Sequence, residues 1–153
     1  MSDTLGDIFT RLAVINAAIT GVKKATKYPP VSVATADLPL AYARWVGARS
    51  LSFGGLSQAM WEIEIVVLVD AIAQGGYDEN MAALIVFPEV MRDLYAGRIH
   101  LNDGDGNELN SGDVSLAAIE YMRNEPVILG DTAYSAVHMN IIVKDLTAVT
   151  VSG

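Results

Sequence analysis

Residues 61–70 have the sequence WEIEIVVLVD, and this stretch decides the fold because it is apolar on more than one face. Alternation of apolar and polar residues with a period of two is typical of a half-buried antiparallel β-strand. The first face would carry Trp61, Ile63, Ile65, Val67 and Val69. The second face begins with Glu62 and Glu64 but becomes apolar at Val66 and Leu68. This strand therefore needs a cover on both faces.

A second stretch, residues 133–145, repeats the two-faced pattern. One face would carry Tyr134, Ala136, His138, Asn140 and Ile142, and the other Ala133, Val137, Met139, Ile141 and Val143. A short chain has few elements with which to cover both faces, so we expect a neighbouring copy to supply part of the cover. This expectation favours an assembling structural protein over an enzyme.

Length and composition predict one globular domain over residues 1–153. Hydrophobic residues make up 52% of the chain and charged residues only 18%, which argues against disorder and suits a subunit with large contacts. The chain has no cysteine, so disulfides, thiolate catalysis and zinc–thiolate sites are excluded. We expect no membrane span, because there is no run of about 20 apolar residues. The segment Met1–Thr4 lacks the basic region of a signal peptide.

The net charge of −8 argues against a nucleic-acid-binding surface, which needs Lys and Arg to replace the counterions of phosphates. Lys23, Lys24 and Lys27 form the only basic cluster. We interpret this cluster as the favourable positive charge at the C-terminus of a helix.

The hydrophobic pattern predicts helices at Leu5–Lys24 and Tyr77–Gly97. Pro88 should kink or split the second helix, because proline removes one backbone hydrogen bond and clashes with the preceding turn. The remaining expected segments are an extended linker at Val31–Pro39, a strand at Leu38–Val46, a loop at Gly47–Ser57, a strand at Trp61–Asp70, a short strand or connection at Arg98–Leu101, a polar loop at Asn102–Asp113, strands at Val114–Asn124 and Ala133–Asp145, and a tail at Thr147–Gly153. This order predicts an α+β fold in which two main helices pack on an antiparallel sheet of four to five strands.

The loop Asn102–Asp113 is rich in Asp, Asn and Gly and invites comparison with a calcium loop. An EF-hand register that starts at Asp103 places Glu108 at the glycine position and Val114 at the position of the bidentate glutamate. A register that starts at Leu101 loses the first and last ligands. We therefore interpret the loop as a solvated turn and predict no metal site.

Other candidates for chemistry have structural interpretations that we favour. His138 lies among apolar residues, so we expect a buried, hydrogen-bonded histidine, and His100 has no ligand partner at a suitable spacing. Glu62 and Glu64 share one strand face, which we expect to be solvated or part of an interface rather than a paired-carboxylate site.

Trp45 is expected to pack in the core, with a subunit interface as the alternative, and the same holds for Trp61. The segment 54–58 lacks the trailing glycine of a nucleophile elbow, and Gly104 and Gly106 lie among acids that would repel phosphate. We predict no catalytic, cofactor-binding or metal-binding residues and no enzymatic activity.

The layout of the whole chain resembles the tail terminator (tail completion) proteins of long-tailed bacteriophages. The resemblance rests on the N-terminal helix that ends at Lys27-Tyr28-Pro29-Pro30, the extended segment with Ala36-Asp37-Leu38-Pro39, the hairpin whose second strand is Trp61–Ala71, the helix Tyr77–Gly97 and the closing strand Tyr134–Val143. It implies a homo-oligomeric, hexameric ring that caps the tail tube, stops its polymerisation and offers a surface to the neck or connector protein. It also implies location in the virion after assembly in the host cytoplasm, with DNA only passing through the lumen. No site residue is carried over from the family.

Two other functions remain open on sequence grounds. The first is a neck or head–tail joining protein, or a tail-tube subunit. The second is a small α+β ligand-binding module or hydrolase, whose polar cluster would be His138, Tyr134, Glu120 and Asn140. For a ring protein, the loops Gly47–Ser57 and Asn102–Asp113 are the expected contact elements. The face with Glu62 and Glu64 would then give the lumen a negative charge that repels passing DNA.

Overall fold

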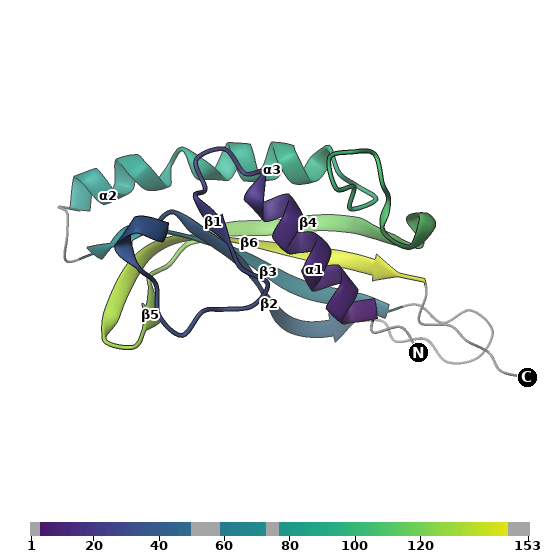
Figure 1. Cartoon of the computed structure of the whole chain (residues 1–153), viewed down its shortest axis with the longest axis horizontal. Helices are drawn as coiled ribbons and strands as arrows, with labels where there is room; N and C mark the ends of the chain where they lie inside the picture. The colour runs from purple at the N-terminus through teal and green to yellow at the C-terminus, as the bar shows by residue number, and fades with distance from the viewer. Residues whose placement is uncertain (1–3, 50–58, 73–76, 147–153) are drawn as a thin grey trace, which may run out of the picture.

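The computed structural model describes residues 4–49, 59–72 and 77–146 and shows a twisted six-stranded sheet with helices on one face (Figure 1). The helices are α1 (Thr4–Ala17), α2 (Tyr77–Leu84) and α3 (Phe87–Ala96), with short 3-10 turns at Thr35–Asp37 and Leu109–Gly112. The strands are β1 (Lys24–Ala25), β2 (Leu40–Arg49), β3 (Ala59–Ala71), β4 (Val114–Asn124), β5 (Val127–Leu129) and β6 (Thr132–Asp145). None of the described helices is long and apolar enough to cross a membrane.

The strand order is β1-β2-β3-β6-β4, and β5 pairs with β6 beside this path. Among the strand pairs that the described residues form, β1–β2 alone is parallel. The two stretches that dominate the sequence pattern, β3 and β6, are adjacent at the centre of the sheet, where Ile65 lies opposite Met139 and Val67 opposite Val137. The predicted α+β class with an antiparallel sheet is therefore confirmed in outline, although the sheet has six strands rather than four or five.

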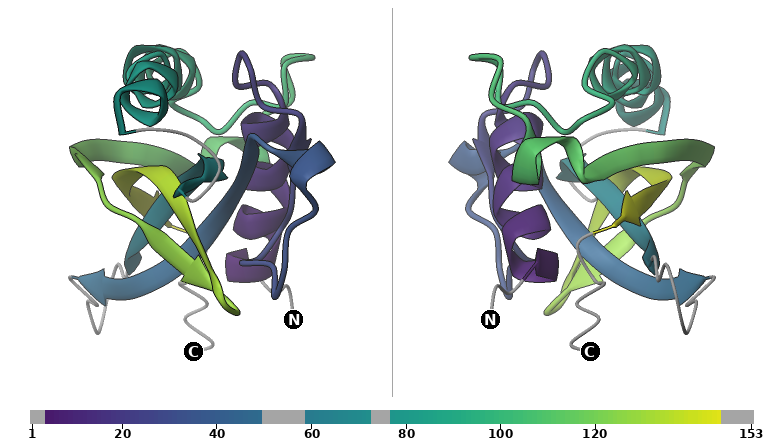
Figure 2. Two further views of the ribbon diagram at one scale, coloured as in Figure 1. Left: turned by 90° about the vertical axis from the view of Figure 1, so that its left-hand side faces the viewer. Right: turned by 90° about the vertical axis from the view of Figure 1, so that its right-hand side faces the viewer.

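The main core lies between the sheet and all three helices. α1 covers the β1–β2 half of this face and the α2–α3 pair contacts β6 and β4, as the end-on views show (Figure 2). The largest fully buried side chains here include Ile8, Leu12, Ile15, Ile63, Ile65, Met91, Tyr95, Met139 and Ile141. Each such aliphatic side chain contributes roughly 1.5–3 kcal/mol when it leaves water, so this face supplies most of the hydrophobic stabilisation.

A second, smaller core covers part of the opposite face. Val66 and Leu68 of β3 are fully buried there against the segment before β2 and against the β5–β6 hairpin. The cluster consists of Leu38, Leu40, Tyr42, Val66, Leu68, Tyr134 and Ala136. The chain itself supplies the cover of these two β3 residues, because its own segments fold back over them, so no neighbouring copy is needed at this position. Sequence reasoning missed β5, whose three residues are too few to show a period.

The first helix is shorter than predicted, since α1 ends at Ala17 and not at Lys24. Gly21 adopts a φ of +95°, a value that glycine reaches without strain, and the chain turns there into β1. The amide of Lys23 donates to the carbonyl of Pro39 at 2.8 Å and that of Thr26 to the carbonyl of Ala41 at 2.9 Å. The basic cluster therefore lies at the edge of the sheet and not at a helix C-terminus, which corrects our interpretation of its charge.

The predicted second helix is split near Pro88, as expected. α2 ends at Leu84 and α3 begins at Phe87, so Pro88 occupies the first turn of α3, where its missing amide hydrogen costs no helical bond. Gly97 caps α3, and its amide donates to the carbonyl of Asp93 at 3.1 Å.

Several boundaries differ from the predicted ones. β2 begins at Leu40 and continues to Arg49 through a bulge between Trp45 and Gly47, so the start of the predicted loop belongs to the strand. The rest of that loop, and the tail from residue 147, lie outside the described residues. Residues 98–101 form a turn and not a strand, and a 3-10 turn ends the polar loop that follows.

Candidate functional site

The most elaborate polar arrangement among the described residues is centred on Glu64, on the second face of the sheet. The Glu64 side chain is only 3% exposed and meets cationic or titratable groups from three other strands. Arg44 of β2 donates to Oε1 through Nε at 3.3 Å and Nη2 at 3.2 Å. Arg123 Nη2 of β4 lies 2.7 Å from Oε2, and His138 Nδ1 of β6 lies 3.1 Å from Oε1. One carboxylate thus joins four neighbouring strands, β2, β3, β6 and β4.

Both ring nitrogens of His138 face hydrogen-bond acceptors. Nδ1 faces the Glu64 carboxylate, and Nε2 lies 2.8 Å from the backbone carbonyl of Glu125. A carbonyl and an ionised carboxylate can only accept, so both bonds form only when the imidazole carries two protons. The prediction of a buried, hydrogen-bonded His138 is confirmed. His100 is exposed.

Burial alone would raise the pKa of Glu64, but its partners outweigh it. The hydrogen bond and charge of His138, the charge of Arg44 and the hydrogen bond of Arg123 together lower the pKa to about 2. Tyr42 lies beside this group, and its burial, with the charge of Glu64, raises the pKa of its phenol to about 12. Near neutral pH, Glu64 is therefore ionised and Tyr42 neutral, so neither exchanges protons readily as a general acid or base.

A shallow hollow of about 320 Å³ lies over this group. Its lining consists of Pro29, Tyr42, Arg44, Glu64, Arg123, Glu125, Pro126, Val127, Leu129 and His138. Each charged side chain in this lining already has an oppositely charged or hydrogen-bonding partner, including Arg123, whose Nε lies 2.6 Å from Glu125. These contacts are better suited to holding the four strands in register than to binding a ligand.

The expectation that Glu62 and Glu64 form a solvated or interface face is wrong for Glu64, which is buried. Glu62 is partly exposed and pairs with Arg49, which also forms a two-pronged ion pair with Glu120 of β4 at 2.6 and 3.0 Å. These carboxylates are matched by arginines, so this face is not an uncompensated acidic surface. The sequence could not reveal Arg44 and Arg123 as partners, because they face Glu64 only in the register of the folded sheet.

The polar loop is ordered by its own aspartate. Asp103 Oδ1 accepts hydrogen bonds from the amides of Asp105 at 2.8 Å and Asn107 at 3.2 Å, and Oδ2 accepts one from the Asn107 side chain at 2.9 Å. The Asn107 side chain is the leading cause of the lowered pKa of Asp103. Arg11 of α1 anchors the loop by donating to the carbonyls of Leu101 and Asn107. In the described part of the chain, no group of three or more His, Asp and Glu side chains is placed to hold a metal ion.

The polar cluster considered for a ligand-binding module does not converge. Tyr134 belongs to the second core, Glu120 pairs with Arg49, and His138 binds Glu64. Trp61 packs against the main core and donates from Nε1 to Asp145 at 3.0 Å, as core packing predicts. Trp45 is 52% exposed, so the prediction that it lies in the core is wrong.

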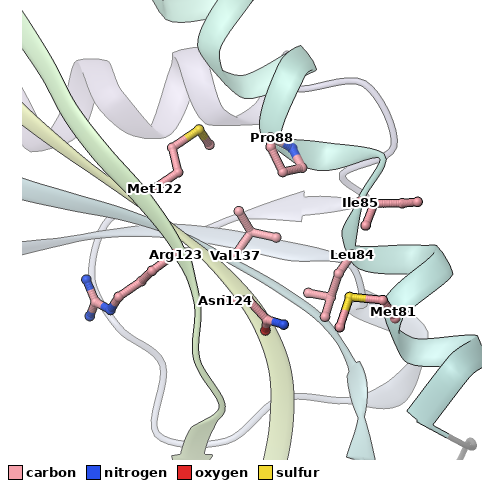
Figure 3. A pocket seen from close by; sticks show the side chains of 8 residues that line it. All are labelled: Met81, Leu84, Ile85, Pro88, Met122, Arg123, Asn124 and Val137. Atoms are coloured by element: carbon pink, nitrogen blue, oxygen red, sulfur yellow. The ribbon is translucent and has the colours of Figure 1, made fainter.

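Two apolar hollows lie on opposite halves of the molecule. The first, which we call the aromatic patch, is lined by Leu5, Phe9, Tyr28, Pro29 and Trp45 between α1 and β2. The second, the methionine groove, lies between the α2–α3 junction and the end of β4 (Figure 3). Its apolar lining consists of Met81, Leu84, Ile85, Pro88, Met122 and Val137, and the Arg123 side chain points away from it.

The two hollows have volumes of 250 and 270 Å³. Both are smaller than the roughly 300–1,000 Å³ of ordinary small-molecule pockets. Large apolar side chains remain exposed beside them, including Tyr28 and Trp45 at the aromatic patch and Ile85 and Val86 at the methionine groove. Such surfaces suit the side chains of a protein partner better than a small ligand.

A scan against models of known protein families finds no match to this chain, and a search of curated proteins finds none either.

Proposed function

We propose that the chain is a structural subunit of a bacteriophage tail that assembles head to tail into a closed ring, caps the tail tube and offers its outer surface to the neck or connector protein. The order of elements supports this proposal, because the N-terminal helix, the β2–β3 hairpin, the split helix and the closing strands are the features on which the resemblance to tail terminator proteins rests. The proposed subunit acts in the virion after assembly in the host cytoplasm and performs no catalysis.

The observation that carries the proposal is the position of the two unlike apolar hollows. The aromatic patch lies on the β2 side of the sheet and the methionine groove on the β4 side. Contact between unlike patches on opposite sides of a subunit is heterologous, and it produces a ring when the rotation closes. A single patch that met its own copy would produce only a two-fold dimer.

The proposed mechanism is geometric. One face of the ring would match the last ring of tube subunits, and the other would lack the surface needed to add another. The outer strand β4 carries bulges between Leu116 and Ala118 and between Ile119 and Tyr121. Bulges on an edge strand disfavour pairing with another sheet, so contact through side chains is the natural route.

The test is the mass and shape of the purified protein, by light scattering followed by negative-stain imaging. We expect closed rings of one size, either for the chain alone or after addition of the tail-tube protein of the same phage. Long tubes formed by the chain alone would favour a tail-tube subunit. A monomer that ignores tube protein would contradict the proposal.

The ligand-binding alternative receives less support. It needs polar groups that converge on a pocket and are free to bind a ligand. The hollow above Glu64 is lined by groups that already bind one another, and the two apolar hollows offer little space. Tight binding of a small molecule to a monomer would restore this alternative.

A further inference from the structure

Positive and negative charges are distributed unequally between the two sides of the sheet. Residues 23–49, which form β1, β2 and the segment between them, contain five basic residues and one acidic residue, a net charge of +4. The opposite side consists of residues 77–96, which form α2 and α3, and of β4 at residues 114–124; together they contain two basic and five acidic residues, a net charge of −3. The acidic loop between them is anchored to α1 by Arg11 and is not counted here. The sheet order places β1 and β2 on one side and β4 on the other, so the subunit has a basic side and an acidic side.

Some of these charges have no ion-pair partner within the described residues. On the basic side, Lys24 pairs with Asp37 at 3.4 Å, but no described carboxylate pairs with Lys23 or Lys27. The Lys27 Nζ lies 5.2 Å from the centre of the Tyr28 ring, at the aromatic patch. On the acidic side, Glu89 follows Pro88 of the methionine groove, is exposed and has no described ion-pair partner. Unmatched charges of opposite sign thus lie beside the two hollows.

We propose that the basic side of one copy docks on the acidic side of the next, with Tyr28 and Trp45 of the aromatic patch covering the methionine groove and Lys27 facing Glu89. This inference rests on the proposed ring and names its interface. The occupant is a second copy of this chain, because the same molecule carries both surfaces with opposite charges.

Complementary charge gives the contact a direction. Two copies that approach with like sides repel one another, whereas unlike sides attract and are steered together. Attraction between exposed charges weakens as salt shortens the Debye length from about 10 Å at 0.1 M to about 3 Å at 1 M. The apolar hollows then exclude water once the copies are aligned. Head-to-tail growth follows, rather than two-fold dimers.

Disulfide trapping tests the interface directly, because the natural chain has no cysteine. Tyr28→Cys and Ile85→Cys change exposed side chains on the two sides. Under mild oxidation, the double variant should give a ladder of linked species that ends at the ring size. A mixture of the two single variants should give linked dimers, and each single variant alone should stay unlinked. A pair of Tyr28→Cys with Asp131→Cys, in the β5–β6 turn, is the control.

Three results would overturn the interface. Linking within one single variant would show a two-fold contact, and linking no faster than in the Asp131→Cys control would show that these sides do not meet. Closed rings in light scattering without the expected links would reject this interface and leave the ring standing. A protein that stays monomeric and does not associate with tube protein would contradict the ring itself.

Charge reversal provides the second test. Lys27→Glu should weaken association at low salt by about 10-fold or more, since like charges would then face each other, and Glu89→Lys should do the same. The double variant, or a mixture of the two single variants, should restore association because opposite charges meet again. Asp131→Lys changes the charge by the same amount as Glu89→Lys and should have little effect. Equal losses in all three variants, without rescue, would contradict the proposed pairing.

Discussion

At the scale of single residues, Glu64 shows how a charge is kept inside this sheet. A buried carboxylate is costly unless its partners replace the water that it loses. Glu64 has Arg44, Arg123 and His138 within 3.3 Å, each from a different strand. The contacts of Glu64 therefore help to specify the fold as well as to stabilise it, because only the native register of the four strands brings these groups together.

Replacing Glu64 by glutamine should lower the free energy of unfolding by roughly 3 kcal/mol, because the substitution leaves the facing cations without a counter-charge. Urea denaturation would measure this loss, provided that the slope of the unfolding free energy against urea concentration is the same in both proteins. Glu62→Gln is the matched control, since Glu62 is partly exposed and its ion pair with Arg49 contributes about 0–1 kcal/mol. Equal losses of unfolding free energy in the two variants would mean that the buried Glu64 contributes no more to stability than the partly exposed Glu62.

The acid sensitivity of the fold should depend on the same residue. The pKa of Glu64 is lower in the folded chain, at about 2, than its ordinary 4.5, so on acidification the unfolded chain binds the proton first. The stabilisation is therefore complete above about pH 4.5 and is lost as the pH falls towards 2. Unfolding free energies measured from pH 6 to pH 2 should fall more steeply for the natural chain than for Glu64→Gln. Parallel curves would contradict this assignment.

At the scale of elements, β3 explains why the fold has two cores. Its first face packs under the helices, and its second face changes along the strand from the Glu64 network to the buried pair Val66 and Leu68. The β5–β6 hairpin and the segment before β2 fold over that pair. The subunit therefore needs no second copy to bury the apolar end of this face.

Leu68→Ala tests this conclusion. The substitution should cost about 2–5 kcal/mol of unfolding free energy, because it leaves a cavity in a fully buried site. The loss should not depend on protein concentration, because the surrounding residues belong to the same chain. Ile128→Ala, at an exposed position of β5, should change the free energy by about 0.5 kcal/mol or less. A loss that appears only in assembled protein would mean that a neighbouring copy provides the cover after all.

At the scale of the whole molecule, the subunit has two unlike sides. The β1–β2 side is basic and carries exposed aromatic residues, and the β4 side, with α2 and α3, is acidic and carries the methionine groove. The exposed apolar residues on these two sides are not members of the Glu64 network. Assembly and stability should therefore respond to different substitutions.

The two tryptophans separate these properties. Trp45→Ala should lower the oligomeric fraction in light scattering and change the unfolding free energy by about 1 kcal/mol or less, because Trp45 is half exposed. Trp61→Ala should cost about 3 kcal/mol, since it loses packing against the main core and the hydrogen bond to Asp145. Unchanged assembly in Trp45→Ala would remove the aromatic patch from the contact.

The sequence by itself determined the class of fold and most of its elements. The alternation of β3 and β6 is local information, as is the interruption at Pro88, so these elements were predicted close to their observed bounds. The end of α1 was missed because the apolar spacing continues to Ile19 and Val22, beyond the point where the helix ends. The three residues of β5 carry too little pattern to be seen.

Only the tertiary structure decided which residues meet. Arg44, Glu64, Arg123 and His138 are separated by up to 94 positions in the sequence and come together through the strand register. The tertiary fold also places Lys23 and Lys27, which flank β1, on one side of the subunit and Glu89, in α3, on the other. A sequence pattern records which face of its own strand or helix a residue occupies, because that depends on local geometry. Which strands become neighbours depends on packing across the whole chain, and this packing gave the subunit its buried ion network and its two unlike sides.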